Sequence, residues 1–344
     1  MTQARFSAIR RVGGLLGLGL AALVAIPAQA QDANWDAVIA AAKKEGKLLV
    51  YNGTNFPIVK QIADKFSAEF GIQTEVLSAR TTEIRERIRV EQSTNRTVAS
   101  VTYNGFTTLF TQMQEGVFQP HGTIPNAKNV AEPLKVNGTM LPIVIGNFVL
   151  MYNTNLVKGD DVPKSWQDLT LAKWQGKILA DDFRAAGAGN VWFEATLNAF
   201  GKEFHEKVAA QKPVFNRNFP ESGRRVARGE YPLYLPFNVS EYPTLQGLPV
   251  KAMVPAEGAA YVPFGTGLLR DAPHPNAGKL FMNYLLSQQA QIMQAAAGYR
   301  PATPGLDGKY PDEVKPLLTG KLLGTTTPGR LSETTKIAEG IYKQ

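Results

Sequence analysis

The sequence of 344 residues contains no cysteine. This absence excludes disulfide bonds, thiolate nucleophiles, iron–sulfur clusters and cysteine-type zinc sites. The only three histidines, His121, His205 and His274, are far apart in the sequence. His205 stands beside Glu203 and Glu206 in a stretch with helical spacing, which predicts an exposed helix face. The sequence therefore offers no histidine-based cluster for catalysis or metal binding.

Long apolar runs and blocks of charge are also missing from most of the chain. After the first thirty residues, no stretch reaches the roughly 18 consecutive apolar residues that a membrane-spanning helix needs. Lys and Arg number 37 against 29 Asp and Glu, yet the excess is spread along the sequence. Nucleic acid is therefore not an expected partner. No long heptad pattern occurs either, so we expect a monomer.

The signatures of common enzyme classes are absent as well. The chain has no Gly-x-Ser-x-Gly elbow, no His-Glu-x-x-His pair and no phosphate-binding Gly-x-x-x-x-Gly-Lys-Ser/Thr loop. Asp181 and Asp182 are neighbours, and neighbouring side chains at a strand end point to opposite faces. We expect a protein without catalytic activity, cofactor or resident metal; a secreted hydrolase is the alternative from another functional class.

The first thirty residues have the pattern of an export signal. Three arginines precede an apolar run from Val12 to Ile26, and Ala28-Gln29-Ala30 supplies small residues at a cleavage site. This pattern predicts a signal peptide over residues 1–30, cleaved after Ala30. The mature protein is then expected to begin at Gln31 in the periplasm.

Strands and helices alternate through the rest of the sequence. Apolar residues predict strands over 47–51, 72–77 and 98–103, with a helix following each of the first two. Two apolar stretches within 140–152 lead into a second alternating set. Alternation of this kind predicts an α/β fold with mostly parallel sheets flanked by helices.

Polar loops follow the predicted strands, and open α/β sheets bind ligands beyond the carboxyl ends of their strands. In the first half of the chain the candidate ligand-binding residues are Asn52, Thr54, Asn55, Arg80 and Asn104. Each loop taken alone could be a simple turn. Three such loops at one sheet edge favour a binding site.

The second half contains a glycine-rich segment between a strand and a helix. Glycines let the backbone approach a ligand, the helix start offers free N–H groups, and an arginine pairs with carboxylate or phosphate. This combination predicts a site for a small organic anion, with the flexible-loop interpretation as the alternative. The candidates in this half are Asn147, Arg184, Gly187, Gly189, Asn190, Asn238 and Tyr242.

Three passages of the sequence resemble the extracellular solute-binding proteins of ABC importers: residues 41–71, 151–178 and 271–301. The nearest branch contains binders of ferric ion, thiamine, phosphonates and sugar phosphates. The resemblance implies a type II periplasmic-binding-protein fold, in which two lobes are joined by a two-strand hinge. It also implies that a small-molecule solute binds in the cleft between the lobes and passes to an inner-membrane ABC permease.

The expected lobes follow from where the hinge strands would cross. The first lobe would comprise residues 31–146 plus about 262–300, and the second 147–261 plus about 301–344.

A ferric-ion-binding protein is the alternative function within this family. Members of the ferric branch usually hold iron with a pair of adjacent tyrosines in the second lobe. For an iron binder, the resemblance therefore implies such a pair in this chain. Here residues 238–243 offer Tyr242 beside Glu241, without a second tyrosine. Because a hard trivalent ion needs several anionic oxygens, the sequence favours an organic anion over iron.

Overall fold

The computed structural model describes residues 35–54 and 56–343. The predicted signal peptide, its cleavage site and the candidate residue Asn55 lie outside these ranges. Within the described part, no helix combines the length and the apolar character needed to cross a membrane.

One mixed sheet runs through the described chain, with strands in the order β2-β1-β3-β9-β4-β7-β5-β6. Strand β10 and strand β8 pair with β4, and β11 pairs with β9. The strands are β1 Lys47–Asn52, β2 Gln73–Ser78, β3 Val101–Gly105, β4 Met140–Asn153, β5 Ile178–Ala180, β6 Val214–Phe215, β7 Leu233–Asn238, β8 Val250–Met253, β9 Ala259–Leu268, β10 Arg300–Pro301 and β11 Leu322–Gly324.

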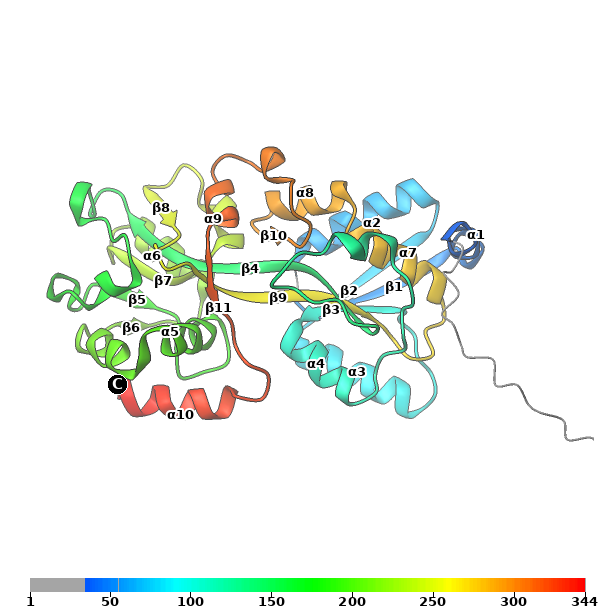
Figure 1. Cartoon of the computed structure of the whole chain (residues 1–344), viewed down its shortest axis with the longest axis horizontal. Coiled ribbons are helices and arrows are strands. Elements are labelled where there is room, and N and C mark those ends of the chain that lie inside the picture. The colour runs from blue at the N-terminus through cyan, green and yellow to red at the C-terminus, as the bar shows by residue number, and fades with distance from the viewer. Residues whose placement is uncertain (1–34, 55, 344) are drawn as a thin grey trace, which may run out of the picture. The chain divides into compact units, whose positions relative to one another are not determined.

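The α-helices cover both faces of this sheet (Figure 1). They are α1 Trp35–Glu45, α2 Pro57–Phe70, α3 Thr81–Ser93, α4 Phe106–Gln114, α5 Ala188–Ala210, α6 Phe219–Ala227, α7 Pro275–Leu285, α8 Gln288–Ala296, α9 Lys315–Thr319 and α10 Leu331–Ile341.

The first half is built on β1, which pairs in parallel with β2 and β3. Helix α2 carries Ile58, Ile62 and Phe66 at a spacing of four, and this stripe is buried against α7 and α8 on one face of the sheet. Gly71 ends α2 in the left-handed conformation, with φ 70°. Helices α3 and α4 cover the other face (Figure 1).

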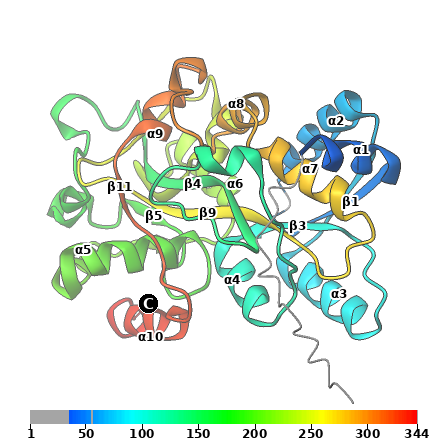
Figure 2. The same ribbon diagram turned by 45° about the vertical axis from the view of Figure 1, so that its right-hand side comes forward.

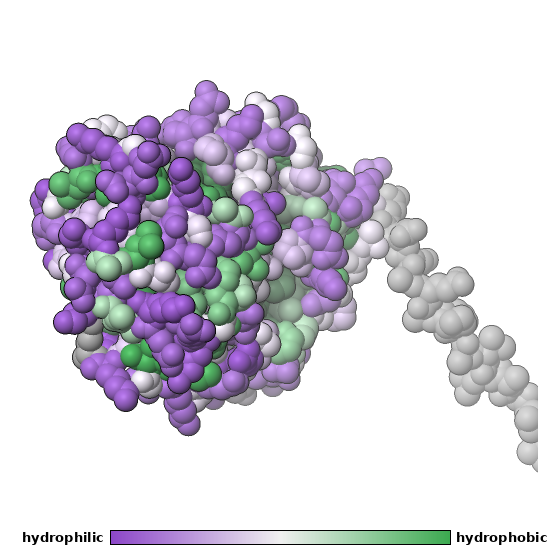
Figure 3. Space-filling view, turned by 60° about the vertical axis from the view of Figure 1, so that its left-hand side comes forward, coloured by the Kyte–Doolittle hydropathy of each residue, from purple (hydrophilic) through white to green (hydrophobic). Residues whose placement is uncertain are grey.

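The second half is built on β5, which pairs in parallel with β6 and β7. Its core is aromatic: Trp192, in the first turns of α5, packs against both Trp166 and Phe183. Hydrophilic residues cover most of the face of the molecule shown in Figure 3, and hydrophobic ones are scattered between them. The predicted α/β fold is confirmed in both halves.

Strands β4 and β9 link the two halves. They run antiparallel, with Val144 opposite Phe264 and Gly146 opposite Val262, and lie side by side in both ribbon views (Figures 1 and 2). Strand β4 is continuous over 14 residues, so the two apolar stretches expected here form a single strand. The predicted lobe boundaries stay a prediction, although this ribbon is the place where they were expected.

The prediction that His205 lies on an exposed helix face is wrong. The ring is fully buried, with Nε2 3.1 Å from Thr196 Oγ1 and Nδ1 3.0 Å from the Tyr342 hydroxyl. Gly201, with φ 76°, kinks α5 just before His205, and Tyr342 covers the ring from the end of α10. Burial lowers the pKa of His205 to about 3, so the ring is neutral in the folded protein.

Candidate functional site

A cavity of about 410 Å³ lies between the two halves, on the face of the β4–β9 ribbon that carries Phe148, Val262 and Phe264. We call it the threonine cavity, because two pairs of threonines line it. Its remaining walls come from three separate segments. The lining residues outside the ribbon are Thr107, Thr108, Ala186, Gly187, Ala188, Asn190, Val191, Thr326, Thr327, Gly329 and Leu331.

The first of these walls is the first turn of α4. Strand β3 ends at Gly105, and the Asn104 side chain fixes this exit because its Oδ1 accepts a hydrogen bond from Gly105 N at 3.0 Å. Helix α4 then starts at once, which places Thr107 and Thr108 in its first turn at the cavity. A helix leaves its first N–H groups without intrahelical partners, so this wall presents donors and the positive end of a dipole.

The second wall is the start of α5, which Asp181 positions. The Asp181 Oδ2 accepts a hydrogen bond of 2.6 Å from Gly189 N, in the first turn of the helix. Glycine is required at 189, because a Cβ there would lie 2.6 Å from the Asp182 carbonyl oxygen. Burial raises the pKa of Asp181 to about 6, and the Gly189 N–H partly opposes this shift.

The third wall is the segment leading into α10, and a buried carboxylate holds it in place. Glu194 of α5 is fully buried and accepts a hydrogen bond of 3.0 Å from Thr327 N. Arg330 lies 3.5 Å from the same carboxylate. This backbone contact holds the segment that brings Thr326 and Thr327 to the cavity wall.

These walls give the cavity a defined chemistry. Two helix starts and four threonines supply hydrogen-bond donors, and aromatic and aliphatic side chains of the ribbon supply an apolar floor. Among its described lining residues there is no Asp, Glu, Lys or Arg. The site can therefore bind the oxygens of an anion through neutral donors, as helix N-termini commonly do.

In the first half, two of the predicted site residues, Asn52 and Thr54, bond to each other. Asn52 Oδ1 accepts from the Thr54 hydroxyl at 2.6 Å, and Asn52 Nδ2 donates to the Ser78 hydroxyl at 3.0 Å. The buried Asn104 shapes the start of α4, as described above, but does not line the threonine cavity. Arg80 is exposed at the start of α3 and does not line it either.

In the second half, Gly187 and Asn190 line the cavity, whereas Arg184 does not. The Arg184 Nε donates to Asp182 Oδ1 at 2.8 Å, and Nη1 donates to the Tyr342 carbonyl oxygen at 3.1 Å. Its guanidinium also lies 4.6 Å from the centre of the Phe215 ring. We therefore assign Arg184 to holding the loop rather than to direct ligand contact.

The two asparagines predicted in the second half serve the backbone. Asn147 Nδ2 donates to the Leu317 carbonyl oxygen at 2.8 Å, and Asn238 Oδ1 accepts from Ser240 N at 3.2 Å.

The alternative metal ligands, Tyr242 and Glu241, have different surroundings. The Tyr242 ring packs edge-on against Phe237 with its hydroxyl beside the backbone of Ala252, and burial raises its pKa. Burial also raises the pKa of Glu241, against the opposing effect of Arg224. No group of three or more His, Cys, Asp or Glu side chains that could hold a metal ion occurs in the part of the chain that the structure describes.

The cavity threonines were not predicted from the sequence. A helix starting directly after Gly105 could have drawn attention to Thr107 and Thr108, because they follow a strand end. Thr326 and Thr327 carry no comparable sequence signal, since they lie in an irregular segment far along the chain.

Comparison with known proteins gives this geometry a family context. Residues 102–321 match the family model described as "Bacterial extracellular solute-binding protein". The iron uptake protein A1 of Synechocystis sp. is 23% identical over 277 residues, covering 74% of this chain and 75% of that protein. A putative 2-aminoethylphosphonate-binding periplasmic protein of Salmonella typhi is 28% identical over 182 residues, covering 49% of this chain and 50% of that protein.

A solved structure supports the same fold. Iron-bound HitA from Pseudomonas aeruginosa superposes with a TM-score of 0.68 at 22% identity, covering 86% of this chain and 99% of that one. The predicted two-lobed fold of the periplasmic-binding-protein type is thereby confirmed. The chain belongs to the bacterial extracellular solute-binding protein family and is a solute-binding protein of the kind that serves ABC importers.

Proposed function

We propose that this protein carries a small organic anion, a phosphonate, phosphate ester or carboxylate, through the periplasm to an inner-membrane ABC permease. The solute binds in the threonine cavity, with its anionic group on the first turns of α4 and α5. The observation that carries the proposal is that both helix starts line one cavity that is free of charged side chains among its described residues. An anion there meets two positive dipole ends, although the Asp181 carboxylate, which is not in the lining, already accepts a hydrogen bond from Gly189 N at the start of α5.

The position of the cavity supports delivery by closure. Its walls belong to both halves, and the β4–β9 ribbon that joins them forms its floor. A solute that contacts both halves favours the closed arrangement by its difference in affinity for the two states.

Ferric ion is the second candidate, because an iron uptake protein is among the relatives. A trivalent ion needs several anionic oxygens, whereas the described lining of the threonine cavity supplies neutral hydroxyl and amide groups. Tyr242 and Glu241, the ligands of the alternative iron hypothesis, do not line this cavity. The organic anion is therefore the better match.

Calorimetric titration of the purified protein tests the proposal. The probes are 2-aminoethylphosphonate, glycerol 3-phosphate, succinate and ferric nitrilotriacetate. We expect one of the three organic anions to bind and ferric ion not to be retained. Replacing Thr107 and Thr108 by alanine should then weaken binding of that anion about tenfold or more per hydroxyl, since a hydrogen bond to a charged group contributes about 1.5–3 kcal/mol.

Thr94→Ala is the matched control. Thr94 is exposed at the end of α3, and its hydroxyl bonds only to carbonyl oxygens of that helix. Its affinity should equal that of the unaltered protein. Retention of coloured ferric ion with no binding of the organic probes would refute the anion proposal and favour iron.

A further inference from the structure

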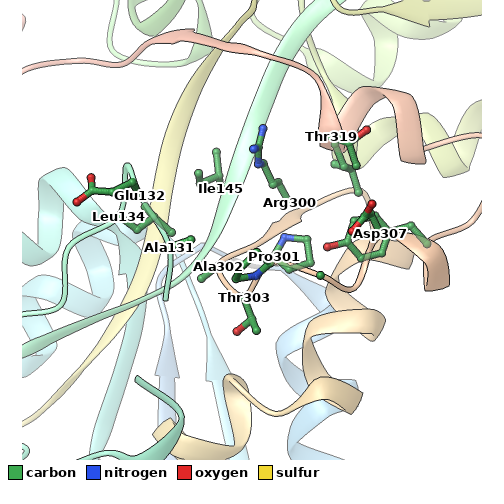
Figure 4. Close-up of a pocket in the computed structure, with 14 residues that line it drawn as sticks. Ala131, Glu132, Leu134, Ile145, Arg300, Pro301, Ala302, Thr303, Asp307 and Thr319 are labelled. Carbon is green, nitrogen blue, oxygen red and sulfur yellow. The ribbon is translucent and has the colours of Figure 1, made fainter. Parts of the chain in front are cut away.

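A second cavity lies on the opposite face of the β4–β9 ribbon. Ile145 lines it, whereas Phe148 lines the threonine cavity, and these residues are three apart on one regular stretch of strand, so they face opposite sides. Its volume is about 220 Å³, below the roughly 300–1,000 Å³ typical of sites for drug-sized ligands. We call it the Arg300 cavity (Figure 4).

Both halves of the molecule contribute to its walls. Leu134 and Ala302 belong to the core of the first half, and Leu318 belongs to a core of the second. Strand β10 carries Arg300 into the cavity, because it pairs with β4 and sets Arg300 opposite Ile145. An occupant would therefore contact both halves.

Arg300 is a half-buried guanidinium, and most of its donors have no partner among the described residues. Nη1 donates to the Gly320 carbonyl oxygen at 2.7 Å. Among the residues that the structure describes, no carboxylate lies within ion-pair distance of it. Burial lowers the pKa of Arg300, and the nearby Tyr310 and Tyr261 partly oppose this effect. A partly desolvated cation without a counter-charge favours an anionic ligand group.

Two carboxylates also line the cavity, at its exposed rim. Glu132 and Asp307 are solvent-exposed, and Figure 4 shows Arg300 between them in that view. A plain anion on Arg300 would be repelled by both rim carboxylates, and a plain cation at the rim would be repelled by Arg300. A ligand that carries both charges compensates all three groups.

We propose that the Arg300 cavity binds a small zwitterion, an α-amino acid or a similar aminocarboxylate. The ligand carboxylate pairs with Arg300, and the ligand ammonium is directed to Glu132 or Asp307. This site is separate from the threonine cavity, since it lies on the other face of the ribbon and shares no lining residue with it.

Three matched probes test the proposal by calorimetric titration of the mature protein: L-alanine, propionate, which lacks the ammonium, and ethylamine, which lacks the carboxylate. We expect L-alanine to bind at least about tenfold more tightly than either. Arg300→Gln should weaken L-alanine binding about tenfold or more, and Arg300→Lys, which keeps the charge, should weaken it less. Thr107→Ala, in the other cavity, and Arg270→Gln, an exposed arginine of another surface, should leave it unchanged.

The combined variant Glu132→Gln, Asp307→Asn separates recognition from damage to the fold. Both side chains are exposed, so the protein should fold normally. The variant should weaken L-alanine binding and strengthen propionate binding, a change of opposite sign that general destabilisation cannot produce. The proposal is overturned if L-alanine does not bind, if it binds no better than propionate, or if its affinity is the same in this variant or in Arg300→Gln.

Discussion

The threonine cavity and the Arg300 cavity lie on opposite faces of the same two strands, yet they would attract a charged ligand by different means. The threonine cavity has two helix starts and hydroxyl groups, without a charged side chain among its described lining residues. The Arg300 cavity has one guanidinium and two carboxylates, and among its described lining residues no α-helix begins. The first depends on backbone geometry, and the second on individual side chains.

This difference determines which substitutions should affect each site. Hydrogen-bond donors of the backbone lose their arrangement when a helix start moves. They need no reorganisation when a ligand binds. Donors held by side chains are removed singly, by changing one residue. Backbone substitutions should therefore affect the threonine cavity and leave the Arg300 cavity intact.

Gly189→Ala should have the largest effect on the threonine cavity. The new Cβ would lie 2.6 Å from the Asp182 carbonyl oxygen and 2.9 Å from that of Asp181, so the start of α5 must move. We expect a loss of about 2–3 kcal/mol in the free energy of unfolding. We also expect the affinity for the organic anion to fall more than about tenfold, measured by denaturant unfolding and calorimetry.

Gly340→Ala is the control for this substitution. Gly340 lies inside α10, and a Cβ there meets nothing within 4 Å. Alanine should stabilise this helix by about 0.5–1 kcal/mol, with no change in anion affinity. Equal anion affinities for Gly189→Ala and Gly340→Ala would contradict a site built on the start of α5.

Local patterns in the sequence predicted the elements well but the cavity walls poorly. The apolar stripe of α2 and its end at Gly71 each depend on residues within a few positions of one another. The threonine cavity instead joins α4, the start of α5 and the segment before α10, and more than two hundred residues separate the first of these segments from the last. Glu194 holds this last segment, and nothing in the spacing of the sequence signals that contact.

The same reason explains the error at His205. Three polar residues at neighbouring positions predicted an exposed face, but the kink at Gly201 and the covering Tyr342 are tertiary features. Burial of a histidine depends on what packs over it, which local spacing does not report.

Asp181 should make anion binding in the threonine cavity depend on pH. The effect should be smaller than that of Gly189→Ala and larger than that of Arg184→Ala. Its pKa of about 6 lies above the ordinary value of 3.8, so it ionises as the pH rises from 5 to 7. The new negative charge at the start of α5 opposes an anionic solute, and affinity should fall roughly threefold to tenfold over this interval. The stability of the folded protein should also fall as the pH rises. The protonated Asp181 carboxyl contributes to the free energy of unfolding below pH 4, and this contribution is lost as the pH rises through 6.

Asp181→Asn should remove both dependences, because the amide oxygen can still accept the Gly189 hydrogen bond but carries no charge. Asp160→Asn, an exposed carboxylate of the second half, is the control. Calorimetric titrations at pH 5, 6 and 7 check the prediction. An affinity that rises with pH in the unaltered protein would show that Asp181 does not act on the solute in this way.

Arg184→Ala should have the smallest effect, and it distinguishes a cavity built on helix starts from one built on an arginine. The Arg184 guanidinium already pairs with Asp182 and with the Tyr342 carbonyl oxygen, so its removal loosens the loop without removing a ligand contact. We expect a loss of about 1 kcal/mol in stability, since the pair is only partly buried. Anion affinity should change by less than about threefold in calorimetry, which is under 1 kcal/mol. A hundredfold loss of anion affinity would instead indicate that Arg184 contacts the solute. The site would then depend on a charged side chain rather than on helix starts.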